Sequence, residues 1–248
     1  MSMNIISLTT IPSRIKYIEK TLKSLLKQTA LIDLIVVNIS RSYKRFPNFN
    51  PESLKLDFVI DSKIKINFCE DYGPASKILS LMDSDLIDST SSIVFLDDDR
   101  IYHKKLIEKL LQQSEKFPSY CIANSTWDTS IFGKDFDYSR TLQPRSIEFK
   151  KEGFGDIFLG CCGVLIKPYM LRNHDFDLHV GNCPELFYSD DLFLSAVLAK
   201  NEIPIYSIVD KDCSRSANDD IDPLANIDRK QKYSASMNYL CNTLGVWR

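Results

Sequence analysis

The stretch Ile93-Val94-Phe95-Leu96-Asp97-Asp98-Asp99 predicts the architecture of this protein. Its first four residues are apolar without interruption, which is typical of a strand buried on both faces of a parallel sheet. Three carboxylates follow directly, where such a strand leaves the core. Because ligands of open α/β sheets bind outside the carboxyl ends of the strands, this junction predicts both a central strand and a candidate site.

Apolar runs and helical patterns alternate on both sides of this stretch. The alternation predicts an α/β protein with an open, mostly parallel central sheet flanked by helices. Strands are expected over 4–8, 34–39, 64–68, 158–167 and 205–209, and helices over 15–26, 74–82, 106–111 and 190–200. Loops are expected over 46–51, 125–155, 173–179 and 210–228.

The composition is that of a globular protein. The chain has 248 residues, of which 44% are hydrophobic and 26% charged, so a full core needs no disulfide or metal to hold it. The net charge of −2 argues against a general nucleic-acid-binding protein, which needs a basic excess. No apolar run is long enough to span a membrane, and the first residues lack the basic start of a signal peptide.

The seven cysteines indicate a reducing compartment. Their number is odd, no two are spaced C-x-x-C, and Cys161 and Cys162 are adjacent, which suits neither an ordinary disulfide nor a zinc site. We therefore expect buried, reduced thiols and a cytoplasmic protein.

The three consecutive carboxylates are the strongest signal for chemistry. They repel one another unless a cation lies near them. Side chains of an extended chain alternate, so Asp97 and Asp99 leave the strand on the same side and can share one Mg²⁺ or Mn²⁺. The alternative is a solvated acidic turn that complements the start of the following helix.

A second candidate segment is Asp71-Tyr72-Gly73-Pro74-Ala75-Ser76-Lys77. Gly73 allows a ligand to come close, and the free N–H groups of the following helix, with Lys77 one turn in, would favour a phosphate. The alternative is a plain strand-turn-helix connection with Pro74 at the first helical position.

A third candidate segment is Ser189-Asp190-Asp191-Leu192. One of its aspartates could act as a general base near the metal. The alternative is structural: Ser189 caps the helix, and the two acids complement the helix dipole.

In this order, the segments resemble the motifs of GT-A glycosyltransferases of the family-two-like kind. The Asp97-Asp98-Asp99 run looks like the D-x-D motif of that family, and the resemblance extends from about Ile5 to Ile208. It implies a Rossmann-like GT-A fold in a single domain over 1–248, with a nucleotide-binding half (1–100) and an acceptor-binding half (101–248). It further implies transfer of a sugar from a nucleotide-diphosphate sugar, a UDP-sugar in the first instance, to a hydroxyl of a glycan, lipid-linked or protein acceptor.

The resemblance also implies roles for individual residues. Asp191, with Asp190 beside it, would deprotonate the acceptor and invert the anomeric configuration. Asp99 would coordinate Mn²⁺ or Mg²⁺, and Asp97 would reach that metal, its water or the ribose. The nucleotide sugar would contact Thr9, Thr10, Pro12, Arg14, Asp71, Gly73, Lys77, Asp97 and Asp98. The acceptor would contact Gly160 and an aromatic stretch that begins at Trp127, although these aromatics could equally anchor a half-buried loop.

The chain departs from the family pattern in three ways, one of which is that the late histidine ligand of some GT-A enzymes has no counterpart after His179. Ser76-Lys77 stands where the family usually has Arg-Asn, and Asp190 replaces a glutamate before the base.

Three other functions stay open. They are a sugar nucleotidyltransferase, which normally has a basic, glycine-rich loop after its first strand, a catalytically inactive nucleotide- or carbohydrate-binding module, and a receiver-type phosphorylation domain, which is about half as long. Segment 210–228 is a candidate lid over the substrate.

Overall fold

The first four strands form a parallel array. In the computed structural model, which describes residues 2–55, 57–82, 84–129, 152–217, 221–224 and 229–247, β1 lies between β2 and β4, parallel to both. Strand β3 pairs with β2 on the outer side. Their bounds are β1 Asn4–Thr9, β2 Leu34–Ser40, β3 Ile64–Cys69 and β4 Ser92–Leu96. The four strands predicted before residue 100 are therefore confirmed.

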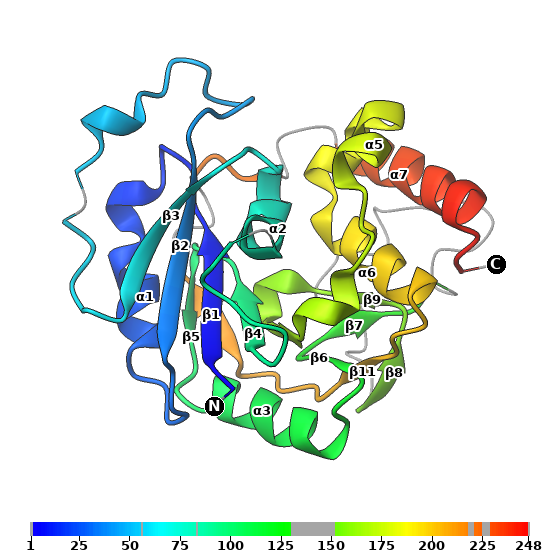
Figure 1. The fold of residues 1–248 in the computed structure, drawn as a ribbon, viewed down its shortest axis with the longest axis horizontal. Helices are drawn as coiled ribbons and strands as arrows, with labels where there is room; N and C mark the ends of the chain where they lie inside the picture. The colour runs from blue at the N-terminus through cyan, green and yellow to red at the C-terminus, as the bar shows by residue number, and fades with distance from the viewer. Residues whose placement is uncertain are drawn as a thin grey trace.

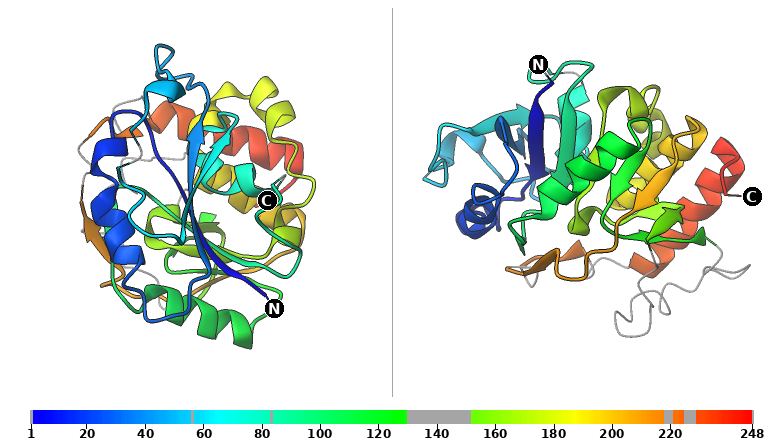
Figure 2. Two further views of the ribbon diagram at one scale, coloured as in Figure 1. Left: turned by 60° about the vertical axis from the view of Figure 1, so that its left-hand side comes forward. Right: turned by 90° about the horizontal axis from the view of Figure 1, so that it is seen from below.

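Strand β4 shows why its sequence is apolar throughout. Ile93 and Phe95 pack into the core on one face of the sheet, and Val94 and Leu96 pack into the core on the other face. The first face is covered by α2 (Ser76–Met82) and α6 (Asp190–Lys200). The second face is covered by α1 (Glu19–Leu25) and α3 (Leu106–Lys116). Figures 1 and 2 show the resulting three layers, with the sheet in the middle.

The remaining strands make the sheet mixed. Its order is β3-β2-β1-β4-β10-β6-β11-β8. Strand β10 (Val164–Ile166) runs antiparallel to both β4 and β6 (Cys121–Ala123). Strand β11 (Ile205–Ser207) is parallel to β6, and β8 (Gly153–Gly155) closes the edge in antiparallel pairing. Four of these seven pairings are parallel, so the expectation of an open, mostly parallel α/β sheet flanked by helices is confirmed.

The single strand expected over 158–167 is wrong. The chain instead forms β9 (Ile157–Phe158), a 3₁₀ turn over Gly160–Cys162 and then β10. Gly163 has a φ of 96°, a conformation that side chains disfavour, and it lets the chain turn from the 3₁₀ segment into β10. This turn brings Gly160 and Cys161 to the same edge of the sheet as the carboxylates that follow β4.

Three expected loops contain regular structure. The segment around residues 173–179 enters α5 (Phe176–Asn182), because Phe176 and His179 are buried against neighbouring elements. In the tail, β12 (Ser214–Ser216) pairs with β5 (Arg100–Tyr102). Strand β7 (Thr126–Trp127) pairs with β9. Helix α7 (Arg229–Leu244) was not expected from the sequence.

Short 3₁₀ segments complete the connections. They are η1 Ile15–Tyr17, η2 Pro51–Ser53, η3 Gly73–Ala75, η6 Pro168–Leu171 and η7 Pro184–Tyr188. All seven cysteines are unbridged, and four of them are buried. Within the described ranges, no helix combines the length and the apolar character that crossing a bilayer requires.

Candidate active site

A cavity of about 340 Å³ opens at the carboxyl ends of β1, β3 and β4. The position is the one expected for open α/β sheets, because the loops after parallel strands meet at one edge. Residues from both halves of the chain line it: Thr9, Thr10, Ile11, Arg14, Tyr43, Arg45, Asp71, Gly73, Pro74, Lys77, Asp97, Asp98, Asp99, Cys161, Phe187, Asp190, Asp191, Asp222, Pro223 and Leu224. The three acidic segments singled out in the sequence therefore face one space.

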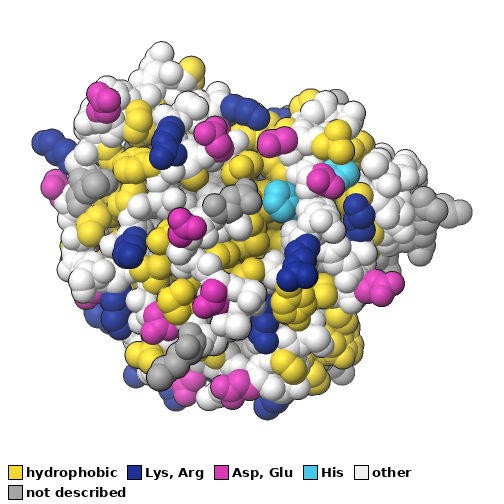
Figure 3. All heavy atoms as spheres, in the orientation of Figure 1, with side chains coloured by type: hydrophobic (Ala, Val, Ile, Leu, Met, Phe, Trp, Pro, Cys, Tyr) yellow, Lys and Arg dark blue, Asp and Glu magenta, His cyan; other side chains and the backbone are white. Residues whose placement is uncertain are grey.

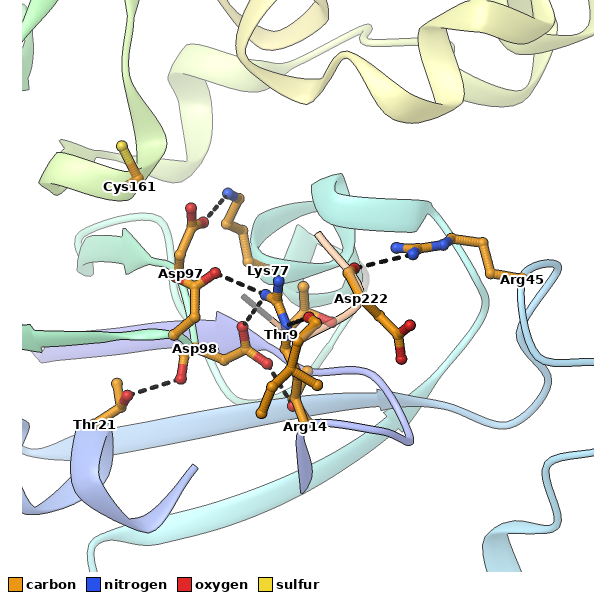
Figure 4. Close-up of polar contacts among 12 residues, drawn as sticks. Thr9, Arg14, Thr21, Arg45, Lys77, Asp97, Asp98, Cys161 and Asp222 are labelled. Atoms are coloured by element: carbon orange, nitrogen blue, oxygen red, sulfur yellow. Dashed lines mark hydrogen bonds and ion pairs between the residues drawn. The ribbon is translucent and has the colours of Figure 1, made fainter. Parts of the chain in front are cut away.

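Asp98 is the inward-facing member of the carboxylate run. It is only 6% exposed. Thr10 Oγ1 donates to its Oδ2 at 2.6 Å, and Arg14 Nη1 donates to its Oδ1 at 2.9 Å. Thr21 Oγ1 donates to the Asp98 carbonyl at 2.7 Å (Figure 4). Burial raises the pKa of Asp98. With both carboxylate oxygens bonded to the protein, Asp98 holds the first loop and α1 against the end of β4.

Asp97 and Asp99 both line the cavity, and each forms an ion pair with a basic side chain of the protein. Lys77 Nζ lies 2.6 Å from Asp97 Oδ1, and Arg14 Nη1 lies 2.8 Å from Asp99 Oδ2. Burial and the charges of Asp97 and Asp98 raise the pKa of Asp99 to about 7. Burial alone would raise the pKa of Asp97, but the Lys77 ammonium outweighs it and holds this pKa below its usual value. The protein thus supplies two of the cations that the carboxylate run requires.

The second acidic pair lies in the first turn of α6. Ser189 does not cap this helix with its side chain, because its Oγ donates instead to the Glu185 carbonyl at 3.3 Å. Asp191 Oδ1 accepts the N–H of Gly160 at 3.0 Å. Burial and the neighbouring Asp190 raise the pKa of Asp191 to about 7. A carboxyl group with this pKa can exchange a proton near neutral pH, as a general base must.

The turn after β3 lines part of the cavity through Asp71, Gly73 and Pro74. Asp71 accepts the N–H of Gly73 at 3.0 Å through Oδ1 and the N–H of Lys44 at 2.7 Å through Oδ2. Gly73 has a φ of 60°, and a Cβ there would lie 2.5 Å from the Phe187 carbonyl oxygen. Only glycine fits this turn, because η3 packs directly against η7.

Three of the predicted contact residues are not among the described residues that line the cavity. Pro12 is not among the described lining residues, and its neighbour Ile11 lines the cavity instead. Gly160 contacts Asp191 through its backbone rather than lining the cavity. Trp127 is 9% exposed and packs in the core. The rest of the aromatic stretch, from residue 130 to 138, lies outside the described residues.

Several lining residues went unnoticed in the sequence. Tyr43 and Arg45 follow β2, so the rule that parallel strands end at one edge could have found them. The segment 221–224 lies within 210–228, the stretch predicted from the sequence as a candidate lid, and two arginines bond to its backbone. Arg14 Nε donates to the Ile221 carbonyl at 2.7 Å, and Arg45 Nη2 donates to the Asp222 carbonyl at 3.1 Å. Figure 4 shows the second of these contacts, with Cys161 on the side of Asp97.

The cavity is strongly acidic, although the chain as a whole is nearly neutral. Its described lining residues comprise seven aspartates and only three basic residues, Arg14, Arg45 and Lys77. On the face seen in Figure 3, by contrast, acidic and basic side chains are interspersed. A ligand that brings a cation into the cavity would therefore be favoured over a bare anion.

Searches against family profiles and against curated proteins find no match for this chain. Solved structures do match. The crystal structure of S. aureus TarS 1-349 aligns with a TM-score of 0.53 and 15% identity, over 100% of this chain and 73% of that chain. The structure of TarS 1-349 in complex with UDP-GlcNAc aligns with a TM-score of 0.59 and 15% identity, over 98% of this chain and 67% of that chain.

The chain has the GT-A fold. The expectation drawn from the order of its motifs is thereby confirmed for the fold. The receiver-type alternative is wrong, since the GT-A arrangement takes up the whole described chain. At 15% identity, the likeness to TarS concerns the fold alone.

Proposed function

We propose that this protein is a glycosyltransferase, which moves a sugar from a nucleotide-diphosphate sugar to an acceptor hydroxyl. The observation that carries the proposal is the meeting of two acid groups across one cavity. Asp97 and Asp99 follow the central parallel strand β4, and Asp191, with a pKa raised to about 7, lies in the first turn of α6 on the other side. UDP-sugars are the first donors to test, because TarS, which shares the fold, has been crystallised with UDP-GlcNAc.

The donor set fits a divalent cation that is shared with a diphosphate. Among the described residues, no group of three acidic, cysteine or histidine side chains forms a ready metal cage. Mg²⁺ and Mn²⁺, however, often take only one or two carboxylates and complete their shell with phosphate oxygens and water. Asp99 and Asp97 would supply those carboxylates, and the aspartate excess of the cavity favours the ion. When bound, the ion would neutralise charge on the departing diphosphate.

Proton transfer and nucleotide binding are assigned to different residues of the chain. Asp191 Oδ1 is held by the Gly160 N–H, which leaves the other oxygen to take the proton of the acceptor hydroxyl. As this proton leaves, the hydroxyl oxygen bonds to the anomeric carbon and the bond from that carbon to the diphosphate breaks. Attack from the side opposite the leaving group inverts the anomeric configuration. Thr9, Tyr43 and Asp71 line the part of the cavity formed by the loops after β1, β2 and β3, where the nucleotide would bind.

The acceptor and the compartment are extensions of the same proposal. We propose a glycan, lipid-linked or protein acceptor with a free hydroxyl, and a cytoplasmic setting that keeps the seven thiols reduced. Gly160 and Trp127 stay predictions for the acceptor side.

A panel of nucleotide sugars tests the function directly. The protein is mixed with UDP-, GDP-, CMP- and dTDP-sugars, with Mn²⁺, Mg²⁺ or EDTA, and its melting temperature and the release of nucleotide are measured. We expect one nucleotide class to stabilise the protein and to be hydrolysed slowly in the presence of a metal. A panel in which no nucleotide sugar has either effect would contradict the proposal.

Turnover should rise with pH through about 7. Asp191 must be deprotonated to accept a proton, and its pKa in the folded protein is raised to about 7 by burial and by Asp190. The rate is therefore low at pH 5, half-maximal near 7 and constant above it. The measurement is the pH profile of kcat/KM for the donor, which reports the pKa values of the ligand-free protein. A profile that is flat between pH 5 and 8 would remove Asp191 from the role of base.

Cys161 offers a label for the bound donor. Its thiol lines the cavity and is partly exposed, so iodoacetamide should alkylate it in the free protein. We expect saturating UDP-sugar with Mn²⁺ to slow this alkylation at least about tenfold, because the ligand occupies the cavity. Peptide mass spectrometry reports the rate, and Cys241 on α7 serves as the internal control. Equal protection of both cysteines would indicate a general stabilisation rather than occupancy.

A further inference from the structure

Lys77 lies between two carboxylates of the site, an arrangement that its position in the sequence does not predict. We infer that Lys77 is a positioning residue, which joins the donor-side carboxylate Asp97 to the base-side pair Asp190 and Asp191 and thereby fixes Asp191 for proton transfer. The inference rests on the proposed function. It replaces the phosphate contact that the sequence predicts for Lys77.

The contacts of Lys77 are with carboxylates on both sides of the cavity. Its side chain is only 4% exposed, and its Nζ lies 2.6 Å from Asp97 Oδ1 and 2.9 Å from Asp190 Oδ2. Figure 4 shows the ammonium group directed at Asp97. A buried ammonium group is costly unless such partners surround it. The Asp97 and Asp190 carboxylates neutralise the positive charge of Lys77, so this charge contributes little to the binding of a diphosphate.

Lys77 is held rigidly from its own backbone. Its carbonyl accepts a hydrogen bond from the buried Ser7 hydroxyl, which ties α2 to β1. The ammonium group therefore reaches the cavity from a fixed helix rather than from a mobile loop. A rigid support of this kind is what a positioning residue needs.

Gly160 completes the arrangement. A Cβ on Gly160 would lie 2.9 Å from Asp191 Oδ1 and 3.0 Å from Lys77 Nζ. The Asp191 carboxylate and the Lys77 ammonium group thus pack around one backbone position, whose N–H also donates to Asp191. Three elements, α2, the 160–162 turn and α6, together define where the base lies.

The charges around Asp191 show what the removal of Lys77 would do. Burial and the charges of Asp190, on its own helix, and Asp97, at the end of β4, raise the pKa of Asp191. The charge of Lys77, from α2, and the Gly160 N–H, from the 160–162 turn, lower it. Without Lys77, three carboxylates would face one another with no cation between them. Asp191 would then hold its proton at neutral pH and be unable to act as a base.

The test separates position from charge with four variants. Lys77→Met removes the charge, and Lys77→Arg keeps the charge but moves the donors. Lys77→Met combined with Asp190→Asn removes two opposite charges. Lys23→Met, at an exposed lysine on α1, is the matched control. Two readouts are used for each: kcat and KM for UDP-GlcNAc turnover with Mn²⁺, and the titration midpoint of the Asp191 carboxyl by ¹³C NMR without any ligand.

We expect Lys77→Met to lower kcat at pH 7 about 100-fold, with KM changed less than about threefold, because the base is misplaced and protonated. Its Asp191 midpoint should rise by at least about one pH unit. Lys77→Arg should lower kcat about tenfold with the midpoint nearly unchanged, and the double variant should bring the midpoint back toward the wild-type value. Lys23→Met should change neither readout.

Other outcomes overturn the inference. An increase in KM with kcat preserved would mean that Lys77 binds the donor directly. A lower kcat with no movement of the Asp191 midpoint in Lys77→Met would make Lys77 merely structural. If Lys77→Met does not fold, Lys77→Arg and the double variant carry the same comparison. Absence of turnover in the wild-type protein would count against the proposed function, whereas the ligand-free NMR midpoints still report on the coupling of Lys77 to Asp191.

Discussion

Replacing Asp191 by Asn should lower nucleotide-sugar turnover about 10³-fold while leaving UDP affinity within about threefold of the wild-type value. The amide cannot accept the acceptor proton, although it keeps the size of the carboxylate and can still accept the Gly160 N–H. The variant also removes one of three neighbouring carboxylates, so its melting temperature should not fall. The measurements are steady-state turnover and calorimetry with UDP and Mn²⁺.

Asp177→Asn is the matched control for this variant. Asp177 also lies in the first turn of a helix, α5, but it is exposed. We expect wild-type turnover from it. Asp191→Asn turnover within tenfold of wild type, or a product that retains the anomeric configuration, would mean that another group takes the proton.

Replacing Asp99 by Ala should abolish the part of UDP affinity that depends on metal. In the wild-type protein, Mn²⁺ or Mg²⁺ should strengthen UDP binding, because a carboxylate and the diphosphate share the ion. Without Asp99, the affinities measured with metal and with EDTA should become equal, and turnover should fall about 10³-fold. Calorimetric titration of UDP with and without Mn²⁺ measures the difference.

The fold should survive this substitution. Arg14 keeps its contact with Asp98, which Thr10 and Thr21 also hold. Asp57→Ala, at an exposed acidic position, is the control and should behave as wild type. If metal strengthens UDP binding equally in Asp99→Ala and in the wild type, Asp99 is not the metal ligand. If it strengthens neither, the reaction does not use a metal in this way.

The part of the fold before residue 100 was predictable, because local periodicity determines it. Strands β1 to β4 are apolar runs that bury both faces, and helix α1 repeats its apolar residues at helical spacing. The part after residue 150 was less predictable. Short strands such as β9 and β10 carry too few residues to show a period, and the turn between them depends on the positive φ of Gly163.

The convergence of the acidic residues was predictable for a topological reason. Parallel strands end at one edge, so the loops after β1, β3 and β4 had to meet. The partners of those acids were not predictable. Lys77 was expected to face a phosphate, yet its ammonium group lies between Asp97 and Asp190. The segment 221–224, inside the predicted lid 210–228, is bonded to Arg14 and Arg45 through its backbone carbonyls, and no local pattern predicts these contacts.

The stretch Ile93–Asp99 by itself determined that a buried strand ends in carboxylates, since hydrophobicity and side-chain type are local properties. Only the tertiary structure decided how each of those carboxylates is bonded within the protein. All three line the cavity. Asp98 is bonded through both carboxylate oxygens, to Thr10 and Arg14, whereas Asp97 pairs with Lys77, and Asp99 with Arg14, through one oxygen each. The physical reason is that ion pairing and burial depend on distances between elements, and those distances are fixed only when the two halves pack together.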